Sequence, residues 1–265
     1  MRLFTKMTVA AIAAASSVLV AAEVIDLTSK DLWLPMKNVE FSEGKMVNDG
    51  RAMYRSKKLI AIDPAKKYTI KMTVSAPGAK RSSAVLFGMY PANAKGQLIT
   101  ARYLQSNPGT LTQVVETAAK GSTTIKVKDG SKWSKSPSSA LIAYDVKADN
   151  SDIPCYKIIG NQITKTEKDG DVWVLTLKKP LTKDFAANSY IRQHSDGGYF
   201  YFGNRQVGSK PATVSTTVTG KSDYGHYNPG KGFHPGMTHA YLVILSDWYN
   251  AKNKVEFKDA TLTIE

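Results

Sequence analysis

The chain has 265 residues, a formal net charge of +14 and one cysteine. A single cysteine excludes an intramolecular disulfide, and a chain of this length can bury a sizeable core without one. The basic charge comes mostly from lysines spread along the chain, with no recognition helix, zinc-ligand spacing or RNA-binding signature. Nucleic acid is therefore not expected as a partner, whereas an anionic polymer such as a uronic-acid or sulfated glycan would be attracted.

Residues 1–22 have the pattern of a secretory signal peptide. Arg2 and Lys6 precede the short, alanine-rich apolar stretch Met7 to Val20, and small residues lead up to Glu23. The apolar stretch is shorter and richer in alanine than a membrane-spanning helix requires. We expect cleavage after residue 22, no transmembrane anchor afterwards, and a secreted, periplasmic or cell-surface protein.

The next part of the chain predicts a series of short strands. Helix-period segments are nearly absent, and turn residues recur about every ten residues, which is typical of an all-β sandwich. The clearest alternation runs from Tyr68 to Val74 and ends at Ala76-Pro77-Gly78. The strands predicted before residue 109 are 24–27, 53–56, 59–62, 68–74, 83–90 and 97–103.

Residues 109–193 differ in composition from the flanking sequence. They contain the stretches TAAKGSTTIKVKDGSKW, ALIAYDV and LTLKKPLTKDFAANSYIRQ. These stretches resemble a small β-module found inserted in phage tail proteins and in exported carbohydrate-active proteins. The resemblance implies a compact accessory unit without a catalytic site. Within it, Cys155 is expected to be a buried small residue, because no histidine lies nearby in sequence to activate it.

After this segment the strand pattern resumes. In YFYFG, Tyr199 and Tyr201 share one strand face while Phe200 and Phe202 share the other, so one of these pairs must be core. Further strands are predicted at 212–219, 238–246 and 255–264. In the last of them the alternation slips by one residue, which predicts a bulge at Lys258-Asp259.

Three stretches outside the module resemble jelly-roll carbohydrate-binding modules of polysaccharide-degrading systems: LIAIDPAKKYTIKMTVSAPG, AVLFGMYPANAKGQLI and VEFKDATLTIE. The resemblance implies a jelly-roll β-sandwich made of residues 23–108 plus 194–265, with the small β-module of residues 109–193 inserted into it. It also implies a polysaccharide or cell-surface glycan as the partner.

Sugar binding needs flat aromatic faces beside polar groups that orient hydroxyls. The region from His194 to Tyr249 is richest in such side chains, and the loop around Tyr224 is too polar to be a strand. Against this, Phe233 and Trp248 are expected to be core residues or loop plugs, because large aromatics in sandwiches are mostly buried. The candidate ligand-binding residues are Tyr199, Tyr201, Arg205, Tyr224, His226, Tyr227 and Trp248.

No cofactor is required, but the resemblance implies a structural Ca²⁺ that ties the first strands to the last. Glu40, Glu43 and Asp259 are the candidate oxygen ligands. The alternative is a set of solvated surface carboxylates, because the sequence lacks a dense Asp/Asn loop.

The preferred function is non-catalytic binding of a polysaccharide, including an anionic one. The alternative is a structural or adhesion protein of the envelope that binds a protein partner through loop aromatics. A polysaccharide lyase is third: Arg192, His194, Tyr199 and Arg205 could supply a base and a neutralising charge, but the strand motifs of jelly-roll lyases are missing, so no catalytic residue is assigned.

Overall fold

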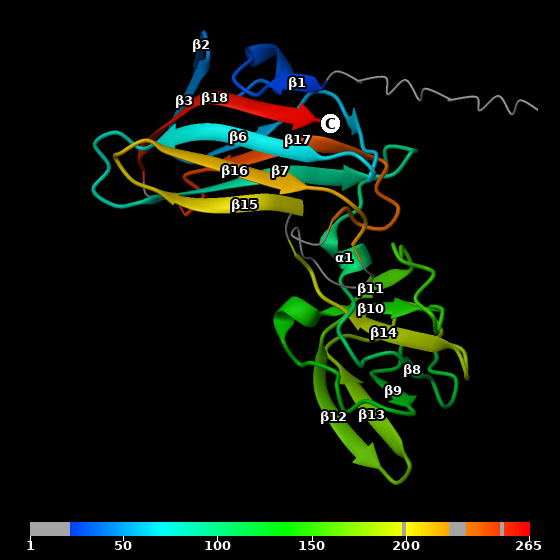
Figure 1. Cartoon of the computed structure of the whole chain (residues 1–265). Helices are drawn as coiled ribbons and strands as arrows, with labels where there is room; N and C mark the ends of the chain where they lie inside the picture. Colours follow the sequence, from blue (N-terminus) through cyan, green and yellow to red (C-terminus); the bar gives the residue numbers. More distant parts are fainter. Residues whose placement is uncertain (1–21, 198–199, 223–231, 250–251) are drawn as a thin grey trace, which may run out of the picture.

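The computed structural model describes residues 22–197, 200–222, 232–249 and 252–265. The predicted all-β class is confirmed: antiparallel sheets make up nearly all the regular structure, and two of them form a sandwich in the upper part of Figure 1. The part of the chain that the structure describes contains no helix long and apolar enough to cross a membrane.

The first sheet of the sandwich contains the closing strand of the chain. Its order is β16 (Ala212–Val218), β6 (Tyr68–Ser75), β18 (Lys254–Ile264), β3 (Lys45–Asp49) and β2 (Val39–Ser42), and β1 (Glu23–Asp26) also pairs with β18. The register of β18 against β6 shifts between Lys258 and Thr261, so the predicted bulge is confirmed.

The second sheet lies against the first. Its order is β15 (Phe200–Val207), β7 (Ser83–Ala92), β17 (His239–Ser246) and β4 (Ala52–Arg55), and the short β5 (Ile60–Ala61) also pairs with β17. A 3₁₀-helix, Lys30–Leu32, lies between β1 and β2.

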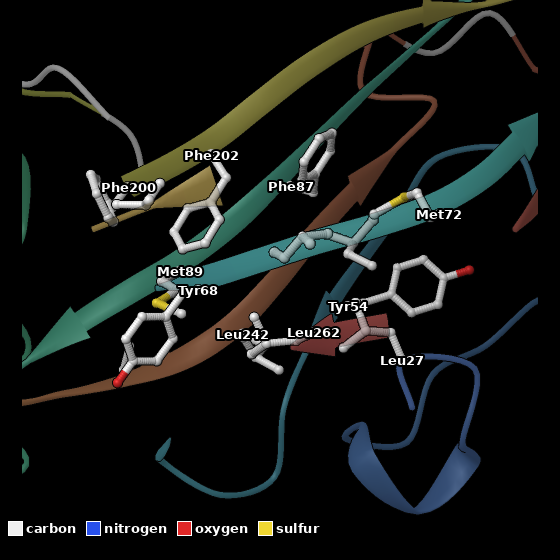
Figure 2. Close-up of a cluster of buried hydrophobic side chains, with 14 of the residues drawn as sticks. Leu27, Tyr54, Tyr68, Met72, Phe87, Met89, Phe200, Phe202, Leu242 and Leu262 are labelled. Carbon is white, nitrogen blue, oxygen red and sulfur yellow. The ribbon is translucent and has the colours of Figure 1, made fainter. Parts of the chain in front are cut away.

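The core of the sandwich is made by alternate residues of both sheets, as the period of a half-buried strand requires. Figure 2 shows Phe87 and Met89 of β7 with Tyr68 and Met72 of β6 between the sheets. Phe200 and Phe202 also lie in this core, so the phenylalanines are the buried pair of YFYFG, while Tyr201 is half-buried. Phe233, predicted as core or a loop plug, is fully buried in the same cluster.

Between β7 and β15 the chain forms two smaller sheets, in the lower part of Figure 1. One has the order β11 (Ile158–Gly160), β10 (Leu141–Tyr144), β14 (Tyr190–His194) and β8 (Thr112–Gln113), and the other β12 (Ile163–Asp169), β13 (Val172–Leu177) and β9 (Thr124–Val127). A 3₁₀-helix, Pro137–Ser139, precedes β10. A hydrophobic cluster separate from the sandwich core fills the space between these strands.

One predicted strand is wrong, and one hairpin was not predicted. Residues 97–103 do not form a strand: Leu98 makes one isolated bridge to Ala92, and the chain then turns into the short helix α1 (Ala101–Leu104). Ala101 and Leu104 are both buried, because an i, i+3 spacing places them on one side of a helical turn. The hairpin of β2 and β3 was not predicted, since only the turn at Gly44, with a φ of 63°, marks it in a polar segment.

Candidate functional site

The second sheet of the sandwich carries aromatic side chains on its outer face, away from the core. Ala240, Leu242 and Ile244 of β17 belong to the core cluster, so Tyr241 and Val243 point outward by strand alternation. On β4, β7 and β15, the residues that alternate with core residues point outward for the same reason. The half-buried residues of this set include Arg55 on β4, Tyr90 on β7, Tyr201 on β15 and Tyr241 on β17. We call these four residues the tyrosine face.

The strand register brings these side chains together. Tyr241 lies directly opposite Tyr90. In the neighbouring row, Val243 pairs with Arg55 on one side and with Gly88 on the other, and Gly88 in turn pairs with Tyr201. Neighbouring strands are about 4.8 Å apart, so the three tyrosines lie within the span of two strand spacings.

A bulge in β15 sets the direction of Tyr201. The register between β15 and β7 shifts between Tyr201 and Gly203, and Phe202 and Gly203 both face the core. The backbone of β15 passes so close to Gly88 that a Cβ atom there would overlap the carbonyl oxygen of Phe200 and lie 2.7 Å from the Cα of Tyr201. Only glycine at position 88 permits this approach, and bulges of this kind commonly re-aim a side chain.

Two arginines are each placed over an aromatic ring along β4. The guanidinium carbon of Arg55 lies 5.0 Å from the centre of the Tyr241 ring, and that of Arg51, just before β4, lies 3.7 Å from the centre of the Trp248 ring. Such cation–π contacts hold a guanidinium in a defined position without neutralising its charge. The outer face therefore presents fixed cations beside aromatic surface.

The turn that carries Trp248 is held by hydrogen bonds. The carboxylate of the fully buried Asp247 accepts hydrogen bonds from the Ser83 hydroxyl at 2.9 Å and from the Lys252 backbone N–H at 2.9 Å. The Trp248 backbone N–H donates to the Ala84 carbonyl at 3.0 Å. This turn joins the last two strands, as the sequence predicts.

The candidate ligand residues from the sequence fall into three groups. Tyr201 and Trp248 lie at this site, both half-buried. Arg205 is exposed on β15, but it pairs with the core-facing Val85, so the bulge places it on the opposite side of the strand from Tyr201. The remaining candidates lie outside the described residues: Tyr199, Tyr224, His226 and Tyr227.

Sequence reasoning missed Arg51, Arg55, Tyr90 and Tyr241. The near-continuous apolar run of β17 does not show which of its faces is core, so it predicts a strand at Tyr241 and nothing about its direction. His239, on the same strand as Tyr241, is half-buried, and its ring lies 3.0 Å from the Thr238 hydroxyl. On β4 and β7, the alternation of apolar core residues with Arg55 and Tyr90 was the signal that could have assigned these two side chains to the outer face.

The structure does not gather the three candidate Ca²⁺ ligands into one group of side chains. Glu40, Glu43 and Asp259 are all exposed, and the backbone N–H of Asp259 donates to the Gly44 carbonyl at 3.2 Å. Among the described residues no group of three or more His, Cys, Asp or Glu side chains could hold a metal ion.

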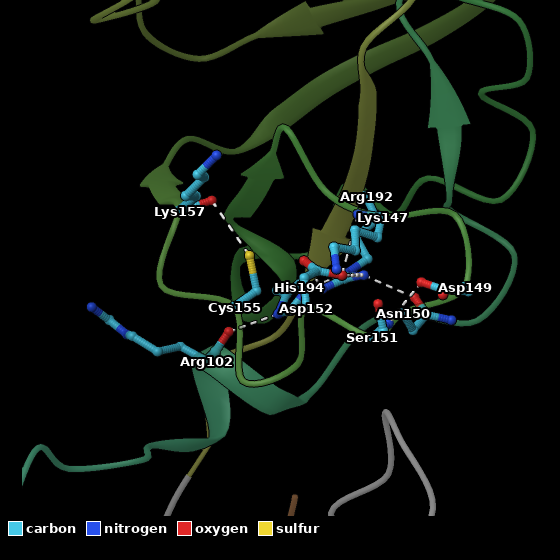
Figure 3. A network of polar contacts seen from close by, with 10 residues as sticks. All are labelled: Arg102, Lys147, Asp149, Asn150, Ser151, Asp152, Cys155, Lys157, Arg192 and His194. Carbon is cyan, nitrogen blue, oxygen red and sulfur yellow. Dashed lines mark hydrogen bonds and ion pairs between the residues drawn. The ribbon is translucent and has the colours of Figure 1, made fainter. Parts of the chain in front are cut away.

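Arg192 and His194, the main residues of the lyase hypothesis, are buried in a structural network (Figure 3). Arg192 makes a two-pronged ion pair with Asp152, with N–O distances of 3.0 and 2.9 Å, and its Nε donates to His194 Nε2 at 2.8 Å. His194 must therefore carry its proton on Nδ1, which donates to the Arg102 carbonyl at 2.7 Å. The network ties the loop after β10 and helix α1 to β14.

The protonation states in this network suit a structural role. Burial, and secondly the charge of Arg192, lower the pKa of His194 to about 4. Burial tends to raise the pKa of Asp152, but the hydrogen bonds and charge of Arg192 outweigh it and hold that pKa below its usual range. Cys155 is buried as predicted, and burial raises the pKa of its thiol. Neither His194 nor Cys155 is poised to react with a solvent-exposed substrate.

The buried histidines give a pH dependence of stability. The pKa of His234 is also lowered to about 4 by burial, whereas the unfolded chain titrates its histidines near the ordinary value of 6.5. Because the unfolded state then binds more protons, the free energy of unfolding should fall as the pH is lowered from about 6.5 to about 4. Urea denaturation across this range measures the slope. His194→Gln, which keeps a donor and an acceptor, should reduce it, and an unchanged slope would contradict this assignment.

Comparison with known proteins identifies no relative. No protein family matches the chain, and no curated protein is significantly similar to it. The tyrosine face is therefore the feature of the molecule from which a function is inferred.

Proposed function

We propose that this protein binds polysaccharide without catalysis, at the tyrosine face. The observation that carries the proposal is the placement of three half-buried tyrosines on three neighbouring strands, next to Arg55. Aromatic rings provide apolar surface for the C–H face of a sugar ring, while phenol hydroxyls and a guanidinium can hydrogen-bond its hydroxyl groups. An open sheet face removes little of a ligand's surface from water, so single chains should bind weakly.

The arrangement of strands supports the same proposal. The connections from β3 to β4, from β6 to β7, from β15 to β16 and from β17 to β18 each pass from one sheet to the other. Two antiparallel sheets linked in this manner are the architecture expected of a jelly roll. We therefore propose a jelly-roll sandwich of the carbohydrate-binding kind, exported through its signal peptide and acting on polysaccharide or cell-surface glycan outside the cytoplasm.

Affinity electrophoresis tests the proposal. The protein should be retarded in gels that contain its polysaccharide, from a panel of neutral and uronate-containing polymers. Tyr201→Ala and Tyr241→Ala should each weaken retardation roughly fivefold, since one aromatic contact is worth about 1 kcal/mol. Tyr156→Ala serves as the matched control, because Tyr156 is exposed on the module between β7 and β15 and should not alter retardation.

Two other outcomes would contradict the proposed function. No retardation by any polymer at low salt would contradict polysaccharide binding and favour the envelope adhesion protein with a protein partner. New absorbance near 235 nm on incubation with a uronate polymer, the signal of an unsaturated product, would show lyase activity. We do not expect it, because Arg192 and His194 are committed to the buried network.

A further inference from the structure

We infer that the polysaccharide is acidic, and that Arg51 and Arg55 bind two of its acidic groups. This inference rests on the proposed function and names the ligand class of the same face. The shared chemistry is an oxyanion, either the carboxylate of a uronate or a sulfate ester, which a planar guanidinium binds through paired hydrogen bonds.

Neither guanidinium has an acidic partner among the residues that the structure describes. Among the described residues, the side chains of Arg51 and Arg55 make only their contacts with Trp248 and Tyr241, and the buried Nε of Arg55 has no hydrogen-bond partner. A half-buried cation such as Arg55, without a counter-ion, costs desolvation free energy that an anionic ligand would offset.

Other arginines of the protein show the contrast. Arg102 is paired with Asp196 at 2.9 Å, and the buried Arg192 is paired with Asp152 at 2.9 Å. These two arginines have structural roles, and each has a carboxylate partner. Arg51 and Arg55 instead lie on an outer face, each oriented by an aromatic ring.

The charge of the whole sheet also favours an anionic ligand. The strands β15, β7, β17, β4 and β5 contain Arg55 and Arg205 but no aspartate or glutamate. The opposite sheet has both signs, for example in the ion pair of Lys45 with Glu256 at 3.1 Å. Acidic side chains are therefore missing from the strands where they would repel an anionic ligand, which is charge complementarity to that ligand.

The spacing of the two arginines bears on the size of the ligand. Arg51 lies in the bend just before β4 and Arg55 ends that strand, so the rise of a strand separates their Cα atoms by up to roughly 13 Å. A single monosaccharide cannot reach both positions. The ligand must be a polymer that runs along β4 and β17, with Tyr241 and Trp248 at the two ends of the contact.

The inference is tested by measuring affinity for four soluble polymers by calorimetry at two salt concentrations. They are a neutral glucan, a uronate polymer, a sulfated glycan and double-stranded DNA. Binding should be tightest to the uronate or the sulfated polymer, and which of the two binds better identifies the oxyanion. Arg55→Gln should weaken that binding about tenfold, the worth of one charged hydrogen bond. The more exposed Arg51→Gln should weaken it about threefold, and both effects should shrink as salt is raised.

Lys71→Gln is the control, because it removes the same charge from an exposed position on the outer side of the opposite sheet. If Lys71→Gln weakens binding to acidic polymers as much as the arginine variants do, or if DNA binds as tightly as these polymers, the inference is overturned in favour of unspecific charge attraction. If the protein prefers the neutral glucan and neither arginine variant changes this, the inference of an acidic ligand is overturned, while the proposal of polysaccharide binding stands. Binding to none of the glycans would overturn both proposals.

Discussion

Asp152→Asn should lower the free energy of unfolding by about 3 kcal/mol, because it leaves the buried charge of Arg192 without its counter-ion. Arg192 is 1% exposed and makes its two-pronged contact only with Asp152. Urea denaturation followed by tryptophan fluorescence measures the change, since Trp133 and Trp173 lie in the same part of the chain.

A matched control separates this effect from the loss of a carboxylate as such. Asp145→Asn removes another carboxylate nearby, one whose ion pair with Lys157, at 3.6 Å, is about half exposed on both sides. Exposed pairs contribute little, so this variant should change stability by less than about 1 kcal/mol. Equal effects of the two substitutions would contradict a special role for the buried pair.

The pH dependence should have the matching sign. The folded pKa of Asp152 is held below its unfolded value, so its contribution is present above the unfolded pKa and is lost as the pH falls through the folded one. Asp152→Asn should therefore lose part of the acid-induced destabilisation. A double variant with Arg192→Met should recover part of the stability, because it removes the unpaired charge as well.

Gly88→Ala should destabilise the sandwich by about 3 kcal/mol, the upper range for adding one methyl group to a packed site. The added Cβ would meet backbone atoms of β15 on three consecutive residues, from the Phe200 carbonyl to the Phe202 nitrogen. Backbone held in a sheet cannot shift as a flexible side chain can, so either β7 and β15 separate or the bulge that orients Tyr201 is lost. Thermal unfolding measures the first effect, and polysaccharide affinity the second.

Gly208→Ala is the control for this substitution. Gly208 follows the end of β15, a Cβ atom added there would have no neighbour within 4 Å, and the residue needs no left-handed backbone conformation. The variant should be neutral or slightly stabilising, because alanine restricts the unfolded chain. A loss of stability as large as that of Gly88→Ala would show that the β15 contact is not the cause.

Much of the fold follows from local pattern. The alternation of Tyr68 to Val74, the turn signals and the slip before Ala260 predicted β6, the all-β class and the bulge of β18, because the strand period of two is written directly in the side chains. The helix α1 escaped prediction, since four residues are too few to show a helical period and a tertiary contact decides their conformation.

The candidate site could be predicted only in part from the local sequence pattern. Tyr201 and Trp248 were named from their chemistry, but their neighbours Arg55 and Tyr90 lie on strands more than a hundred residues earlier in the chain, and pairing over such distances leaves no local signal. Arg192 and His194 have the chemistry of a catalytic site, yet burial beside Asp152 gives them a structural role.

The sequence by itself determined the strand-rich class, the excess of basic charge and the pattern expected of an export signal, because these depend on composition and on the nearest neighbours in the chain. Only the tertiary structure decided which face of each strand is core. The bulge at Tyr201–Gly203 placed Arg205 on the opposite side of β15 from Tyr201, and the pairing of β4, β17, β7 and β15 brought Arg55, Tyr241, Tyr90 and Tyr201 onto one surface. The physical reason is that the register of a sheet is set by long-range packing, and a shift of one residue exchanges the two faces of a strand.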